Sequence, residues 1–271
     1  MMNLETVNLV VSERVARIEL NRPDKANAMN RQMWQDILAA FRRVDEMTEA
    51  RVAVISGRGK YFTSGIDLDM LAGLRQQMQD DCDGRSSERL RRTILDLQDT
   101  LSSIERCRKP VIAEIHGACI GGGIDLITCC DMRYAAADAY FSVKEIDVGM
   151  TADVGTLQRL PKLVPDGVVR ELAYTGRRFD ADEAKAIGLV NNVYQTPEAL
   201  RAGVAETAAT IAAKSPLSIR GIKEMILYSR DHSVADGLNY VATWNAAMLM
   251  SEDLAEAMIA AKEKRAPKFR D

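Results

Sequence analysis

The chain has 271 residues, of which 47% are hydrophobic and 28% are charged, a balance that is ordinary for a globular protein with a sizeable core. Its formal net charge of −3 gives no reason to expect a nucleic acid as partner. No apolar run is long enough to cross a bilayer, so we expect no membrane partner either.

The five cysteines do not form the pattern of a disulfide-rich or zinc-binding protein. Their number is odd, no C-x-x-C pair is present, and His116 and His232 are the only histidines. We therefore predict free thiols, a reducing compartment and no metal site. The N-terminal sequence does not resemble a signal peptide and the last residues are not a peroxisomal signal, so the cytoplasm is the expected location.

The first part of the chain predicts a hairpin, a helix and a strand. Residues 7–21 contain two apolar runs separated by a polar S-E-R segment, which is typical of a β-hairpin. Asn30 can cap a helix that continues to about Met47, because apolar residues recur there at helical spacing. Residues 52–56 form the next predicted buried strand.

The most polar stretch covers residues 71–92, and its composition predicts a mobile surface segment. We expect Ser86 or Ser87 to start a helix that continues to Cys107. Five apolar residues follow the helical period in it: Leu90, Ile94, Leu97, Leu101 and Ile104.

Residues 110–161 combine an apolar strand, three consecutive glycines and three acidic residues. Residues 111–115 predict a buried strand, and residues 124–130 predict a helix. The glycines 121–123 allow a sharp turn between them, and amides at the positive end of a helix can bind an oxyanion. The spacing G-x-x-x-G-G-G matches neither the dinucleotide fingerprint nor a P-loop, so a nucleotide site is weakly supported.

The three acidic residues are Asp125, Glu145 and Asp153. Taken singly, Asp125 suits the first turn of a helix, and the other two suit solvated loops. Their shared apolar surroundings favour a functional interpretation, because a carboxylate among apolar side chains is a candidate for a raised pKa and for proton transfer.

The rest of the chain is mainly helical. Helices are predicted at 167–175 and 181–186 and a short strand at 189–193, followed by helices at about 197–213, 216–229, 234–250 and 252–263. Trp244, Met248, Leu249 and Met250 give this tail an apolar surface that suggests packing on another subunit.

Five segments occur in order between residues 20 and 190: L-N-R-P-D-K-A-N-A-M-N, Y-F-T-S-G-I-D-L, G-A-C-I-G-G-G-I-D-L, C-D-M-R-Y and T-L-Q-R-L-P. Together they resemble the enoyl-CoA hydratase/isomerase family, the crotonase superfamily. The segment K-E-I-D-V-G-M-T-A-D-V-G-T-L-Q-R-L-P is most similar to the members that isomerise dienoyl-CoA thioesters. The resemblance implies an α/β fold, a crotonase-like spiral of ββα units in residues 1–196 that holds the acyl-CoA site. It also implies a helical C-terminal oligomerisation region, residues 197–271, since family members are usually trimers or dimers of trimers.

The resemblance further implies which residues bind an acyl-CoA. The backbone amides of Ile66 and Gly122 would form an oxyanion hole for the thioester oxygen. Asp67 is better explained as the cap of the following helix. Lys25 or Arg22 could meet a phosphate of the CoA nucleotide, although a solvated loop charge explains Lys25 slightly better. The full set implied to bind substrate is Ser64, Gly65, Ile66, Asp67, Gly122 and Gly123.

Isomerisation of a 3,5-dienoyl-CoA in fatty acid β-oxidation removes a proton from C2 and adds one at C6, roughly 5 Å away. One fixed carboxylate serves both positions poorly. We therefore predict that Asp153 takes the first proton, that Glu145 delivers the second, and that Asp125 orients or tunes Glu145. No cofactor is expected, because CoA is part of the substrate. Two alternatives stay open: an enoyl-CoA hydratase in which Asp125 and Glu145 hold water, and a member that binds without turnover.

Overall fold

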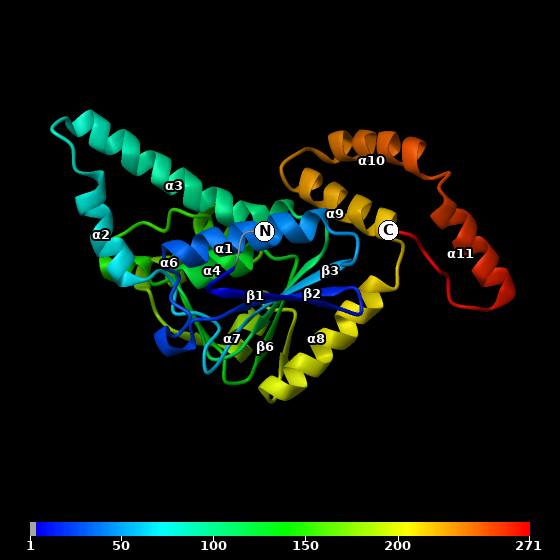
Figure 1. Cartoon of the computed structure of the whole chain (residues 1–271), viewed down its shortest axis with the longest axis horizontal. Helices are drawn as coiled ribbons and strands as arrows, with labels where there is room; N and C mark the ends of the chain where they lie inside the picture. The colour runs from blue at the N-terminus through cyan, green and yellow to red at the C-terminus, as the bar shows by residue number, and fades with distance from the viewer. Residues whose placement is uncertain (1–3) are drawn as a thin grey trace.

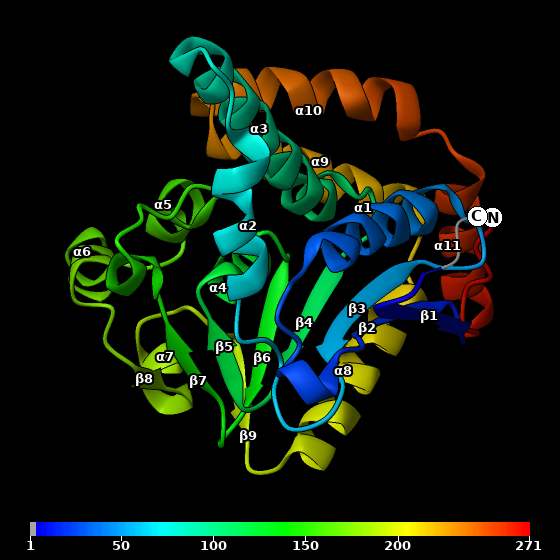
Figure 2. The same ribbon diagram turned by 60° about the vertical axis from the view of Figure 1, so that its left-hand side comes forward.

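Two β-sheets form the centre of the computed structural model, which describes residues 4–271 except for the side chains of residues 75–77 (Figures 1 and 2). The larger sheet has the strand order β1-β2-β3-β4-β6-β9. Its strands are β1 Val7–Ser12, β2 Val15–Leu20, β3 Val52–Gly57, β4 Val111–Ile115, β6 Met132–Ala136 and β9 Asn192–Tyr194. The smaller sheet has the order β5-β7-β8, with β5 Ala118–Ile120, β7 Tyr140–Ser142 and β8 Phe179–Asp180.

The large sheet begins with the predicted hairpin, in which β1 and β2 are antiparallel and Val7 lies opposite Leu20. Every later pair in this sheet is parallel. All residues of β3 and of β4 are buried, as expected for parallel strands covered on both faces.

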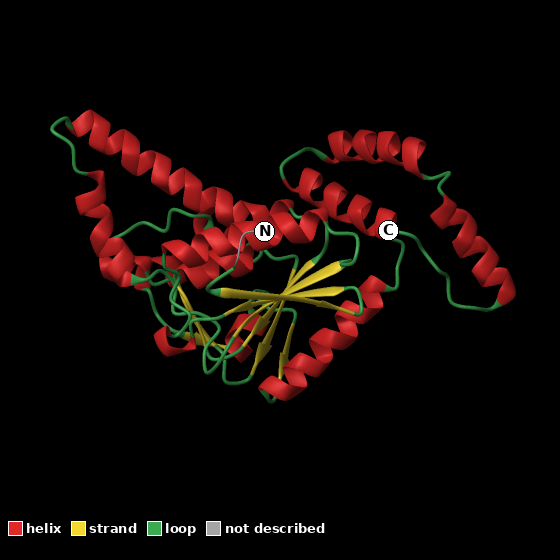
Figure 3. Ribbon diagram, in the orientation of Figure 1, coloured by secondary structure: helices red, strands yellow, loops and turns green. Residues whose placement is uncertain are grey.

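Helices cover both faces of the large sheet (Figure 3). On one face, α8 (Pro197–Ala212) places Leu200, Val204 and Ala208 against the strands, because residues four apart share one side of a helix. The other face packs against α1 (Arg31–Glu46), α3 (Asp83–Arg106) and α4 (Gly122–Thr128). The predicted cap of α1 is confirmed, since the Asn30 side chain accepts a hydrogen bond from the Met33 amide at 3.0 Å.

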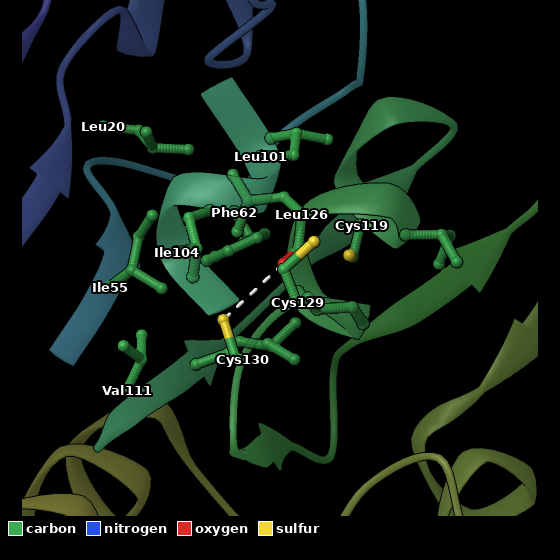
Figure 4. Close-up of a cluster of buried hydrophobic side chains, with 14 of the residues drawn as sticks. Leu20, Ile55, Phe62, Leu101, Ile104, Val111, Cys119, Leu126, Cys129 and Cys130 are labelled. Carbon is green, nitrogen blue, oxygen red and sulfur yellow. Dashed lines mark hydrogen bonds between the residues drawn. The ribbon is translucent and has the colours of Figure 1, made fainter. Parts of the chain in front are cut away.

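The core around α4 combines aliphatic side chains with thiols (Figure 4). Leu101 and Ile104 of α3 are fully buried there, and the Cys130 thiol donates a hydrogen bond to the Leu126 carbonyl. All five cysteines are free, as predicted, and four of them are buried. Burial raises the pKa of Cys130 to about 12, so this thiol stays protonated.

The segment predicted as a mobile polar surface forms two helices instead. Helix α2 covers Leu68–Met78, and α3 begins at Asp83 rather than at Ser86 or Ser87. Leu, Gln, Arg and Met all favour helix, and this propensity decides the structure where polarity alone suggested a loop. The Ser86 hydroxyl accepts a hydrogen bond from the Asp80 amide at 3.0 Å, so it closes the turn between the two helices.

Two further boundaries differ from the prediction. Helix α4 begins at Gly122, two residues before the predicted start, so two of the three consecutive glycines belong to its first turn. Strand β9 begins at Asn192, because the amides of Leu189 and Val190 both donate to the Ala184 carbonyl and end the preceding helix. That helix is α7, Ala181–Ala186; α5 is Thr156–Arg159 and α6 is Asp166–Thr175. Short 3-10 helices cover Pro23–Lys25, Glu145–Val148 and Leu160–Lys162.

The tail forms α9 (Pro216–Arg230), α10 (Val234–Met248) and α11 (Glu252–Glu263), within two residues of the predicted helices. The side chains of Ser215, Ser233 and Ser251 cap their N-termini. These helices extend away from the sheets (Figure 1). Among the described residues, no helix combines the length and the apolar character needed to cross a bilayer.

Candidate functional site

Two turns bring the amides of Ile66 and Gly122 together. A Cβ placed on Gly122 would lie 3.6 Å from the Ile66 nitrogen. Gly65, at a φ of +90°, allows this approach, because a Cβ there would lie 2.6 Å from the Ile120 carbonyl oxygen. The Met29 amide donates to the Gly65 carbonyl at 2.8 Å and holds the first turn in place.

Both amides are available to a ligand. Within the described part of the chain, neither the Ile66 nor the Gly122 amide donates a hydrogen bond to another residue. Gly122 is the first residue of α4, where a helix leaves its N–H groups unpaired and carries partial positive charge. Two unpaired donors this close together are what an oxyanion hole requires.

Asp125 is fully buried in the first turn of α4. Its Oδ1 accepts a hydrogen bond from the Thr156 amide at 2.6 Å, whereas its Oδ2 has no partner among the described residues. Burial raises the pKa of Asp125 to about 6; the charge of Asp153 adds to this effect, and Thr156 and Arg159 oppose it. This carboxyl group can therefore exchange a proton near neutral pH.

Glu145 lies near enough to Asp125 for the charge of one carboxyl group to act on the other. Its Oε2 is buried and, like the Asp125 Oδ2, has no partner in the described structure. Burial, followed by the charge of Asp125, raises the pKa of Glu145 to about 7. A single proton held between the two carboxyl groups would satisfy both unpaired oxygens.

Asp153 is half-buried and lines a cavity of about 650 Å³ together with Ile66. Burial raises the pKa of Asp153 as well. The cavity lies between α2 and α3, and its apolar walls are formed by Leu71, Leu74, Met78, Leu90, Ile94, Leu97 and Met150. Its apolar lining suits a long apolar group, and Ile66, which carries one of the two free amides, lies on the same wall.

The other predicted binding residues have mainly structural contacts. Asp67 caps α2 through the Asp69 amide at 3.0 Å and pairs with Arg22 at 2.8 Å, and this pairing lowers the pKa of Asp67. Arg22 is therefore occupied inside the protein. A Cβ on Gly123 would lie 2.7 Å from the Thr63 side chain, so glycine is required there for packing.

Three contacts in the site were not predicted from the sequence. The Thr156 amide donates a hydrogen bond to Asp125, and the Gln98 side chain donates one to the Asp153 carbonyl. The Arg159 guanidinium lies next to Gly155 of the same loop. The only signal for two of them was the T-L-Q-R-L-P segment, which contains Thr156 and Arg159. Among the described residues, no group of His, Cys, Asp or Glu side chains is placed to hold a metal ion.

Comparison with known proteins shows the family and the fold of the chain. The family model described as enoyl-CoA hydratase/isomerase matches residues 11–271. A human mitochondrial Delta(3,5)-Delta(2,4)-dienoyl-CoA isomerase is 49% identical over 93% of this chain and 77% of its own length. A peroxisomal protein of the same name from Arabidopsis thaliana is 48% identical over 98% of this chain and 96% of its own. The crystal structure of an enoyl-CoA hydratase from Bacillus anthracis matches with a TM-score of 0.89 at 30% identity, over 98% of this chain and 99% of that one, which confirms the predicted fold.

Proposed function

The chain belongs to the enoyl-CoA hydratase/isomerase family, and on that premise we propose that it is a Δ3,5-Δ2,4-dienoyl-CoA isomerase of fatty acid β-oxidation. The observation that carries the proposal is a third carboxyl group, Asp153, on the wall of the apolar cavity next to the Asp125–Glu145 pair. Hydration needs only the pair, whereas moving a proton between two distant carbons needs a further group.

In the proposed reaction the thioester oxygen accepts hydrogen bonds from the Ile66 and Gly122 amides. Asp153 takes a proton from C2, and the electron pair of the broken C–H bond forms an enolate whose charge the two amides stabilise. Losing one such donor typically costs about 3 kcal/mol of transition-state stabilisation. The double bonds then shift by one position and C6 takes a proton from Glu145.

The two proton-transfer groups need opposite charge states at the start of the reaction. Asp153 must be ionised, and Glu145 must be protonated. A pKa of about 7 keeps a large share of Glu145 protonated near neutral pH, and Asp125 contributes to this shift. The proton gained by Asp153 must return to Glu145 before the next turnover, so the reaction consumes no net proton.

The experiment that tests the proposal is product analysis with purified protein. A 3,5-dienoyl-CoA should give a product with the absorbance of a conjugated 2,4-diene, and no water should be added. A protein that leaves this substrate unchanged would overturn the proposal.

Enoyl-CoA hydratase is the second candidate. The neighbouring carboxyl groups of Asp125 and Glu145 favour it, because two carboxyl groups can hold and activate a water molecule. Water addition to a 2-enoyl-CoA at a rate above that of dienoyl isomerisation would support this alternative. A protein that binds acyl-CoA without either reaction would support a binding role.

We further propose that residues 1–196 carry the site and that residues 197–271 join subunits into a homotrimer or a dimer of trimers. The exposed apolar side chains of the tail support this assembly. We propose no cofactor apart from the CoA of the substrate. The cytoplasmic location stays a prediction, because the human relative is named mitochondrial and the Arabidopsis relative peroxisomal.

A further inference from the structure

One side of α3 holds the loop that carries Asp153. Gln98 donates through Nε2 to the Asp153 carbonyl at 2.6 Å. Arg159 donates through Nη2 to the Ser102 hydroxyl at 3.1 Å, and through Nε and Nη2 to the two oxygens of Glu105, both at 3.2 Å. Residues 98, 102 and 105 are four and three positions apart and therefore lie on one side of the helix. We call Gln98, Ser102, Glu105 and Arg159 the loop clamp.

Arg159 is also tied to the loop itself. Its amide donates to the Gly155 carbonyl at 3.0 Å. Its guanidinium lies against Gly155, where a Cβ would come within 2.1 Å of Nη1. Thr156, whose amide holds Asp125, lies between the two attachment points. The loop clamp therefore positions two groups together: the Asp153 carboxyl group, and the Thr156 amide that donates to Asp125.

Core packing also holds this stretch of loop, because Ala152, Val154 and Thr156 are buried. A cavity of about 480 Å³ is lined by the loop clamp together with Val154 and Gly155. Glu105 also accepts a hydrogen bond from Arg230 at the end of α9, so the helical tail supports the same carboxylate. The charged contacts of Arg159 add direction to this packing, because a bidentate pair between Arg and a carboxylate fixes the geometry of both groups.

Arg159 carries the positive charge that acts on Asp125. Burial raises the pKa of Asp125, and Arg159 opposes this rise together with Thr156. The charged and titratable groups around Asp125 are Glu145, Asp153, Arg159 and the thiols of Cys119 and Cys129. Removing the guanidinium would leave Asp125 with carboxyl and thiol neighbours only.

We propose that Arg159, anchored by Glu105 and Ser102, is a positioning residue for the isomerisation and holds Asp153 and the Thr156 amide in place for proton transfer. The inference rests on the proposed function. Arg159 lines the cavity of about 480 Å³ and not the cavity of about 650 Å³ that holds the acyl chain in the proposed function. It therefore acts through the loop and not on the substrate.

The variants Arg159→Met, Arg159→Lys and Glu105→Gln separate charge from geometry. Arg159→Met should lower kcat by about 10- to 100-fold with KM changed much less, because small misplacements of reacting groups have effects of this size. Its pH profile should also shift to higher pH, since the pKa of Asp125 rises. Arg159→Lys keeps the positive charge but loses the planar guanidinium that donates from two nitrogens at once. It should therefore keep the wild-type pH profile and recover part of kcat.

The matched control is Arg42→Met, which removes a different ion pair to α3, with Asp99 at 3.1 Å. Hydrogen exchange of residues 153–159 gives a readout without substrate. It should become faster in Arg159→Met and Glu105→Gln and stay unchanged in Arg42→Met.

The outcomes separate the two proposals. A wild-type protein without isomerase activity overturns the function, whereas unchanged loop exchange in Arg159→Met overturns the loop clamp. Lower kcat with an unshifted pH profile, or exchange that rises equally along the whole chain, shows a merely structural role and also overturns the inference.

Discussion

The three carboxyl groups of the site differ in the contacts that hold them. Asp125 has one hydrogen bond from a backbone amide, a buried oxygen of Glu145 has no partner among the described residues, and Asp153 lines the cavity between α2 and α3. The sequence predicts these three acids because acidic residues among apolar neighbours stand out. It could not predict the amide of Thr156 as the partner of Asp125, since a backbone donor leaves no trace in residue type.

Asp153→Asn is the substitution that distinguishes isomerase from hydratase. It keeps size and hydrogen bonding but cannot take a proton. We expect dienoyl isomerisation to fall by about 10²–10⁴-fold, the usual contribution of a positioned base, and a similar loss for Glu145→Gln. Asp125→Asn should be milder. The rate is followed at the diene absorbance, with folding checked by circular dichroism; a wild-type rate in folded Asp153→Asn would refute the role of this residue.

The raised pKa of Glu145 predicts a pH-dependent stability. Because the folded state favours the protonated form, it binds more protons than the unfolded chain between about pH 4.5 and 7. The free energy of unfolding therefore falls as pH rises through this window. Glu145→Gln removes the titration and should be more stable than wild type at pH 8, by on the order of 2–3 kcal/mol, with no gain below about pH 4.

Urea unfolding at pH 4 and pH 8 measures this difference. The control is Glu49→Gln, at an exposed position, which should show no gain at either pH. An equal effect of Glu145→Gln at both pH values would contradict a buried, coupled carboxyl group.

At the scale of the elements, the apolar residues along one side of α3 fall into two groups. Leu101 and Ile104 enter the core, whereas Leu90, Ile94 and Leu97 line the cavity. The helical period predicted that these five residues share one side of a helix. It could not separate core from cavity, because that depends on where α2 lies, and the polarity of the segment around α2 predicted a mobile surface stretch instead of a helix.

The turn at Gly65 should not accept a side chain. Gly65→Ala would place a Cβ 2.6 Å from a backbone oxygen at a φ of +90° and would force Ile66 away from Gly122. We expect a loss of about 1–3 kcal/mol in the free energy of unfolding and loss of most turnover. Gly167→Ala is the control: it meets no atom within 4 Å, lies in α6 and should be neutral or slightly stabilising. Thermal unfolding and turnover are measured for both variants. If Gly65→Ala were as stable and as active as Gly167→Ala, the proposed oxyanion hole would be contradicted.

At the scale of the whole molecule, the order of strands and helices follows from periodicity, but the sheet arrangement does not. The small sheet of β5, β7 and β8 was not predicted, because strands of two or three residues carry no periodic signal. The spiral fold was predicted from the repeated strand–strand–helix order together with the family resemblance. Neither route shows the state of assembly, because another subunit lies outside the chain itself.

The exposed apolar side chains of the tail predict self-association. Ile226, Leu238 and Met250 are 67%, 64% and 90% exposed, in a region that extends away from the sheets (Figure 1). Such a surface is rarely left open to water in a monomer, and burying it recovers about 25 cal/mol per Å². The protein should therefore sediment at three or six times its 30.0 kDa monomer mass.

The sharpest form of this test compares Ile226→Asp, which puts a charge into the apolar surface of the tail, with Val10→Asp, which alters a 62% exposed residue of β1 outside the tail. Ile226→Asp should shift the protein toward smaller species at micromolar concentration, because a buried unpaired charge is costly, while Val10→Asp should sediment like wild type. Sedimentation of the wild-type protein at the monomer mass over this range would show that the tail packs no second subunit.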